Sequence, residues 1–115
     1  MSSILTSIKK SIGIAESDEN FDQDIQMHIN TYLSVLCQLG VGPKEGFSIR
    51  DKSATWEDFL GEGTSNLDAV QTYVYIKVRL VFDPPASSAV IDSMTRTANE
   101  LEWRLNEAAD KSGMP

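Results

Sequence analysis

The longest apolar run in the chain covers residues 73–82 and is followed by Asp83 and two prolines. Its apolar residues alternate with polar ones, a pattern typical of a β-strand. From Asn66 onward, apolar residues also recur at steps of three and four, as they do on one face of an α-helix. This face consists of Leu67, Val70, Val74, Lys77, Val78 and Val81. The helix also accounts for the residues before the run, so we favour a helix over residues 66–82, with the strand as the alternative.

Two further helices are predicted ahead of this central one. Residues 2–14 place isoleucine and leucine side chains on one side, which predicts a short amphipathic helix that must dock on the rest of the protein. Residues 21–39 also keep helical spacing, and the glycine that follows is a common stop signal. Asn20 and Gln23 fit a capping box at the start of this second helix.

A last helix is predicted over residues 88–109, capped by Ser87 or Ser88. It carries a regular heptad seam formed by Ile91, Met94, Ala98, Leu101, Leu105 and Ala108. Its flank carries two i,i+4 pairs, Asp92 with Arg96 and Glu100 with Arg104. Trp103 lies off the seam and is expected on another face. About three heptads are short for a free coiled coil, so the seam favours packing within the chain over an intermolecular zipper.

Residues 41–63 differ from the rest, because glycines and scattered charges indicate a long loop. The loop nevertheless holds Phe47, Trp56 and Phe59, and is therefore too aromatic for a disordered linker. Thr55 resembles an N-cap, which predicts one short helical turn over residues 56–60. The fold class predicted is thus all-α, a small bundle of four main helices with a long loop carrying a short helical turn.

Length, charge and cysteine content limit the classes of protein to which the chain can belong. With 115 residues the chain is expected to form a single domain over residues 1–115. The net charge of -7 argues against sequence-independent binding to nucleic acid and against binding to an anionic membrane. Cys37 is the one cysteine, so no internal disulfide is possible, and no apolar stretch approaches the roughly 20 residues that span a bilayer. We expect a soluble protein made in the cytoplasm.

Catalytic signatures are absent from the sequence, which has no phosphate-binding glycine loop, nucleophile elbow or paired-histidine motif. His28, the one histidine, shares a helical side with Asp24 and Tyr32. Two ligands do not make a metal site, so a polar helix face is the better interpretation. Cys37 lacks a basic neighbour and is expected to be a small core residue. The sequence therefore predicts no enzyme, and neither catalytic, metal nor cofactor-binding residues.

Two kinds of residue stand out as candidates for interfaces. Lys77 and Arg79 interrupt the central apolar run, and their stems are expected to reach water or a carboxylate of the same chain. The alternative is that they pair with an acidic surface of another subunit. Trp56, Phe59 and Trp103 would be interface residues if they are exposed, because aromatic residues dominate binding hot spots.

The order of several segments resembles the head-tail connector (adaptor) proteins of tailed bacteriophages. The most specific parts are the run Thr72-Tyr-Val-Tyr-Ile-Lys-Val-Arg-Leu-Val-Phe-Asp-Pro-Pro85 and the segment Glu100-Leu-Glu-Trp-Arg-Leu105. The remaining segments are residues 8–14, 21–25, 38–42 and 55–60. Together these segments cover nearly the whole chain, and they encode no chemistry.

The resemblance implies a helical bundle that assembles as a ring, expected to be a dodecamer, beneath the portal protein in the neck of the virion. Such a ring extends the channel through which double-stranded DNA passes without sequence-specific binding, and docks the next neck, stopper or tail-completion protein. No cofactor and no membrane are implied. Under this interpretation Lys77, Arg79 and Arg104 meet acidic residues of a neighbour, and Trp56, Phe59 and Trp103 are apolar contacts.

A second hypothesis comes from the seam of the last helix. A small regulatory or adaptor protein would use that seam to form a dimer, burying Ile91, Met94, Leu101 and Leu105 against their own copies. Leu101→Asp should dissolve such a dimer, whereas in the ring interpretation the same change would disrupt the fold of the monomer.

Overall fold

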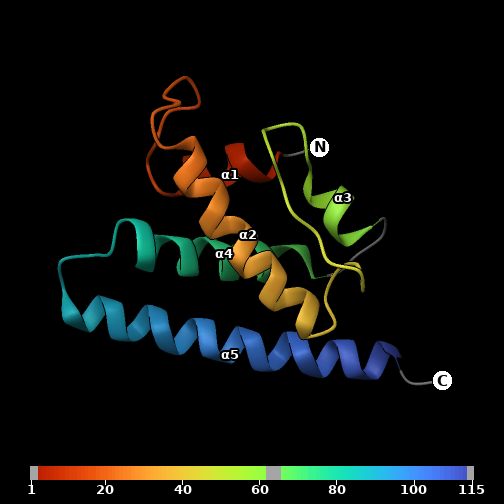
Figure 1. The fold of residues 1–115 in the computed structure, drawn as a ribbon. Coiled ribbons are helices and arrows are strands. Elements are labelled where there is room, and N and C mark those ends of the chain that lie inside the picture. The colour runs from red at the N-terminus through yellow and green to blue at the C-terminus, as the bar shows by residue number, and fades with distance from the viewer. Residues whose placement is uncertain (1–2, 62–65, 114–115) are drawn as a thin grey trace.

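The computed structural model describes residues 3–61 and 66–113, with side chains described as far as residue 110. Its helices are α1 (Ile4–Ser11), α2 (Asp22–Gln38), α3 (Trp56–Leu60), α4 (Leu67–Phe82) and α5 (Ser88–Gly113). Within the described residues no strand occurs, only an isolated bridge between Ser3 and Thr55. The long helices α2 and α5 both lie against α4, and α1 and α3 lie on the far side of α4 from α5 (Figure 1). The predicted all-helical bundle is confirmed.

Helix α4 is the centre of the core, and the strand interpretation of residues 73–82 is wrong. The alternation that imitated a strand arises because α2 and α5 both pack on α4, with α1 making a smaller contact. Burial therefore extends beyond a single stripe of the helix and includes Val74, Ile76 and Val78. Asp83 ends the helix before the two prolines, as expected from their fixed backbone geometry.

Helix α5 runs antiparallel to α4 along its length and continues to Gly113, four residues beyond the predicted end (Figure 1). The Val90 N–H donates to the Ser87 hydroxyl at 3.3 Å, so Ser87 is the cap. Among the predicted flanking pairs, Glu100 and Arg104 form an ion pair of 2.8 Å, whereas Asp92 and Arg96 form none in the described structure.

The heptad seam of α5 is used inside the chain. Ala98 and Leu105 are buried in the core, and Met94 and Leu101 pack against it. A dimer built on this seam would have to remove these side chains from their own core. The dimeric regulatory protein therefore lacks the free surface that it requires.

Helices α1 and α2 are joined by a buried lysine that the sequence did not reveal. Lys9 is 2% exposed, and its Nζ donates to the carbonyls of Glu16 at 3.1 Å and Asp18 at 2.7 Å. The same atom lies 2.8 Å from Oδ1 of Asp22, in the first turn of α2. This cation draws the chain back after α1, which ends at Ser11 and not at residue 14. Of the predicted residues 2–14, residue 2 lies outside the described part.

The capping box predicted at Asn20 and Gln23 is wrong. Phe21 occupies the N-cap position, without a side-chain cap, and the Asn20 N–H donates instead to Asp18 Oδ1 at 3.1 Å. Lys9 pairs instead with Asp22, whose carboxylate lies in the first turn of α2, where the helix dipole favours a negative charge. A contact between two helices has replaced a local one.

The loop between α2 and α4 packs over the core. Asn30 of α2 fixes it by accepting from the Ile49 N–H at 2.7 Å and donating to the Ile49 carbonyl at 3.0 Å. The predicted helical turn is α3, which begins with a full capping box between Thr55 and Asp58. Residues 62 and 63, at the end of the predicted loop, lie outside the described residues.

Candidate interaction surfaces

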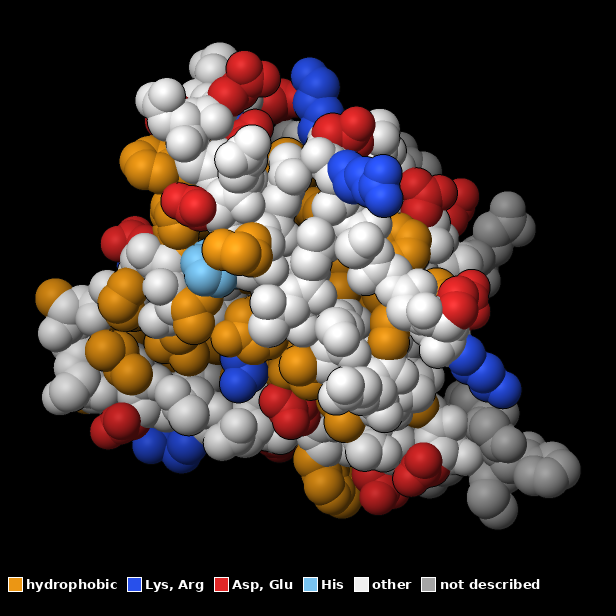
Figure 2. Space-filling model, viewed as in Figure 1, with side chains coloured by type: hydrophobic (Ala, Val, Ile, Leu, Met, Phe, Trp, Pro, Cys, Tyr) orange, Lys and Arg blue, Asp and Glu red, His pale blue; other side chains and the backbone are white. Residues whose placement is uncertain are grey.

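An exposed apolar surface lies where the start of α2 and the end of α4 come together. Its large side chains Phe21, Met27 and Val81 are between 44 and 59% exposed. The ring of Phe82 connects the helices, because its centroid lies 5.6 Å from that of Phe21 and 6.5 Å from that of His28. Figure 2 shows hydrophobic side chains gathered on this side of the molecule, over the turn between α4 and α5. We call Phe21, Met27, His28, Val81 and Phe82 the apolar surface.

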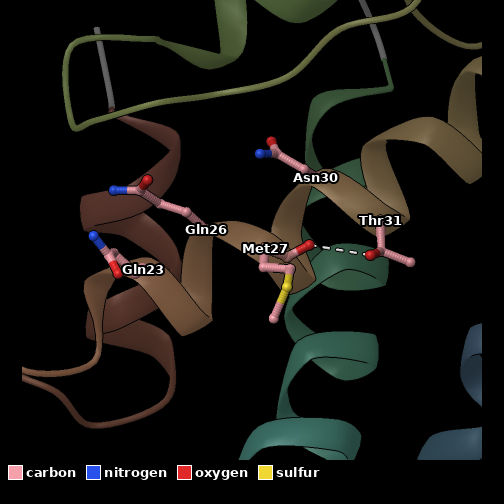
Figure 3. A pocket seen from close by; sticks show the side chains of 5 residues that line it. All are labelled: Gln23, Gln26, Met27, Asn30 and Thr31. Carbon is pink, nitrogen blue, oxygen red and sulfur yellow. Dashed lines mark hydrogen bonds between the residues drawn. The ribbon is translucent and has the colours of Figure 1, made fainter.

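A groove of about 530 Å³ lies beside this surface along α2. It is lined by Gln23, Gln26, Met27, Asn30 and Thr31, and Figure 3 shows their polar side chains on either side of Met27. The Thr31 hydroxyl donates to the Met27 carbonyl at 3.0 Å, and Asn30 is engaged with the loop. The groove offers amides, a hydroxyl and a thioether. These groups can bind a polypeptide surface but supply neither a nucleophile nor a general base.

Trp103 is the most exposed of the large hydrophobic side chains, with 65% of its surface accessible. It lies on the outer face of α5, away from the seam, as predicted. A second groove of about 530 Å³ borders it, between α5 and Leu39 at the end of α2, and carries the carboxylates of Glu102, Glu107 and Asp110. Trp103 is thus an apolar projection with an acidic rim.

The other two aromatic candidates are core residues of this chain. Trp56 is 3% and Phe59 is 1% exposed, and the ring of Phe59 packs on that of Phe47 at 5.3 Å between centroids. Exposure was the condition for an interface role, and in the isolated chain Trp103 meets it whereas Trp56 and Phe59 do not.

Lys77 belongs to a polar network where α2, α4 and α5 meet. Its Nζ lies 3.9 Å from Glu102 Oε2 and 5.8 and 5.9 Å from the ring centroids of Tyr32 and Tyr73. The Tyr73 hydroxyl donates to the same Glu102 oxygen at 2.7 Å. Burial, and then the bond to Glu102, raise the pKa of Tyr73 well above its ordinary value, so the hydroxyl stays a donor. The expected pairing of Lys77 with a carboxylate of its own chain is confirmed.

The two arginines have different surroundings. Arg79 Nε donates to the Asp83 carbonyl at 2.8 Å, where it satisfies the end of α4, and Nη1 donates to the Tyr75 hydroxyl at 3.4 Å. Arg104 pairs with Glu100 on the open surface of α5. An exposed pair of this kind contributes little to stability, so both of its members can change partner at low cost.

His28 and Cys37, the residues considered for chemistry, lie in surroundings that do not favour reactivity. His28 stands edge-on to Phe82. Burial, and then the charge of Glu45, raise the pKa of the Cys37 thiol, which keeps it protonated. In the described part of the chain no cluster of three or more histidine, cysteine or carboxylate side chains is placed to hold a metal ion. None of its helices is both long enough and apolar enough to cross a membrane.

These features define a class: a small helical protein whose distinctive surfaces are suited to contact with other proteins. The comparison with protein families then identifies it, because the family model for phage connector protein matches residues 4–112. The chain belongs to this family, and the resemblance drawn from the sequence is confirmed. Comparison with curated proteins and with solved structures found no significant match. Membership gives the protein a structural role in a phage particle, in association with portal or neck proteins.

The sequence pattern did not reveal the apolar surface. Val81 belongs to the same helical stripe as the buried Val74, and its exposure follows only from where α2 and α5 diverge. Ile25 and Ile29 lie on the core side of α2, and Met27 lies two residues from each of them. Helical geometry therefore puts Met27 on the outer face, and this could have been noticed in the sequence. Trp103 was found because it falls off the heptad seam.

Proposed function

We propose that this protein is a head-tail connector subunit that forms a ring under the portal, extends the DNA channel and docks the next neck or tail component. The observation that carries the proposal is that a single chain exposes two unlike surfaces, the apolar surface and the face of α5 around Trp103. A closed ring needs contacts of this kind, in which one face of each subunit meets a different face of the next.

The charge of the chain supports a passive channel. With a net charge of -7, and with five carboxylates between residues 16 and 24, the subunit repels phosphate. A wall that repels a duplex lets it slide, whereas a basic wall binds it. The DNA therefore passes through the ring without being held or read, and residues 1–115 act as one structural unit.

The remaining interface candidates fit contacts with neighbours. Arg104 and Glu100, paired on the open surface of α5, can re-pair across a subunit boundary. Lys77 and Arg79 are engaged within their own chain, so we expect them to orient the helices that form the contact. The loop over residues 41–61 is fixed to α2 by Asn30 and offers exposed charged residues for a contact with the portal.

Binding to purified portal particles tests this function. Light scattering and co-sedimentation should show the protein bound to portal particles, whether or not it oligomerises alone. A protein that stays monomeric at every concentration and also ignores portal particles would refute the proposal.

A further inference from the structure

We infer that Arg50 of one subunit binds in the groove beside Trp103 of the next, a contact that rests on the proposed ring function. Trp103 is 65% exposed and borders a groove of about 530 Å³ between α5 and the end of α2. This groove is the receiving half of the contact, and the guanidinium group of Arg50 is the inserted half.

The groove has the chemistry of a cation site. Glu107 and Asp110 lie one and two turns after Trp103 on α5, so their carboxylates share its face of the helix. In the described part of the chain neither of these carboxylates forms an ion pair, whereas Glu102, also in the groove, is paired with Lys77. An exposed indole face attracts a cation, and a free carboxylate beside it can bind the same group.

Among cations, a guanidinium group suits this site best. Its planar charge stacks on an aromatic face while its fork of N–H donors reaches a carboxylate. Arg79 and Arg104 are engaged within their own chain. Arg50 and Arg96 are exposed and, as far as the structure describes the chain, form no hydrogen bond or ion pair. These two arginines are therefore the ones that a second copy can offer at no cost to its own contacts.

Position selects Arg50 over Arg96. Arg96 lies two turns before Trp103 on the same helix, so it would reach the groove of a copy only if two α5 helices paired about a two-fold axis. Such a pairing closes a dimer and not a ring. Arg50 follows Ile49, whose N–H and carbonyl are both bound to Asn30 of α2, so its backbone is already fixed. A side chain on a fixed backbone loses less conformational entropy on binding.

Arg50 and Trp103 lie on opposite sides of the subunit. Asp51 and Lys52, which follow Arg50, line a cleft with Leu5 of α1, and α1 lies on the far side of α4 from α5 (Figure 1). A helix with its side chains is about 10–12 Å across, so an arginine side chain cannot pass α4 to reach its own groove. Each subunit therefore offers Arg50 to one neighbour and its groove to the other, an arrangement that can close into a ring. The other exposed charges of the loop stay available to the portal.

Charge reversal on each side tests the contact on portal particles. Arg50→Glu sets two carboxylates against each other, and Glu107→Arg sets two cations against each other. Either variant alone should weaken assembly on the portal by about 10-fold or more, a loss typical of a hot spot. An equimolar mixture of the two variants should assemble again, because every contact between alternating subunits then joins opposite charges. Lys10→Glu, the same change of charge at an exposed residue of α1, is the control and should assemble normally.

Substitutions of Trp103 test the aromatic face. Trp103→Phe keeps a ring and should retain part of the affinity, whereas Trp103→Leu keeps only apolar area and should lose about 10-fold or more. Because Trp103 is exposed, neither change should alter the circular dichroism spectrum or the unfolding midpoint. Full assembly by Trp103→Leu would show that the indole face binds no cation.

Cross-linking shows which parts of neighbouring subunits meet. With Cys37→Ser as background, a variant carrying Ser48→Cys and Asn99→Cys is bound to portal particles and treated with a short bifunctional maleimide. Both positions are exposed, and Arg50 and Trp103 stay in place. The contact predicts a ladder of covalent multimers from the double variant and only single chains from either cysteine alone. Dimers from Asn99→Cys alone would refute it in favour of a two-fold contact between α5 helices.

The outcomes separate this contact from the function. If the unmodified protein forms rings in electron micrographs but Arg50→Glu assembles equally well, the contact is refuted and the function stands. The same holds if the mixture of variants assembles no better than either variant alone. If the unmodified protein forms no ring on the portal, the proposed function fails and the contact fails with it.

Discussion

Replacing Lys9 with methionine tests whether a buried cation joins α1 to α2. Methionine keeps the length of the apolar stem but removes the ammonium group that contacts two carbonyls and Asp22. Removing one partner of a buried ion pair costs about 3–5 kcal/mol, because the other charge stays behind uncompensated. Asp22 keeps partial access to water, so we expect the lower end of this range, about 3 kcal/mol.

Urea unfolding followed by circular dichroism gives the measurement. With a slope of about 1.5 kcal/mol per molar urea, a loss of about 3 kcal/mol lowers the unfolding midpoint by about 2 M. Lys10→Met is the matched control, because Lys10 is the next residue of the same helix and is exposed. It should change stability by less than about 0.5 kcal/mol.

A double-mutant cycle shows whether the loss comes from the ion pair. Asp22→Asn removes the charge that Lys9→Met leaves uncompensated, so the double variant should be more stable than the sum of the two losses by about 1–3 kcal/mol. Strict additivity, or a loss below about 1 kcal/mol for Lys9→Met alone, would show that Lys9 is a spectator in this turn.

Two other predictions follow from the packing. Gly42→Ala should lower the free energy of unfolding in urea by at least about 2 kcal/mol, because φ is +89° and the added Cβ would lie 2.5 Å from the ring of Phe59. Gly46→Ala is the control: its φ is +97° but the space around it is open, so it should cost only the backbone strain of about 1 kcal/mol. Because burial, and then the bond to Glu102, raise the pKa of Tyr73 in the folded protein, stability from this group is complete below about pH 10 and falls above it by about 1.4 kcal/mol per pH unit. Tyr73→Phe should flatten that fall between about pH 9 and 11, and an unchanged slope would contradict the raised pKa of Tyr73.

Much of the fold could be read from the sequence because its signals are local. The prolines after Asp83, the Thr55 and Asp58 capping box and the seam of α5 each depend on residues within one or two helical turns. The period of residues 73–82 was ambiguous because α4 is buried on more than one side, and its central place in the core only emerges once α2 and α5 are in position.

The features that sequence reasoning missed depend on contacts between distant residues. Lys9 resembles the neighbouring Lys10 at the end of a helix, and nothing local indicates that its ammonium group is buried against Asp22 of α2. Trp56 and Phe59 are enclosed because the loop folds back over the core, with Gly42 allowing the close approach of the Phe59 ring. The apolar surface exists only where the start of α2 meets the end of α4, so periodicity within any one helix cannot predict it.

The most direct test of this protein as a ring-forming connector is a reconstruction by electron cryomicroscopy of portal particles incubated with it. The account predicts a closed ring of subunits coaxial with the portal channel, with unlike faces of adjacent subunits in contact. Bare portal particles at saturating protein concentration, or protein bound only as a symmetric dimer off the channel axis, would contradict it.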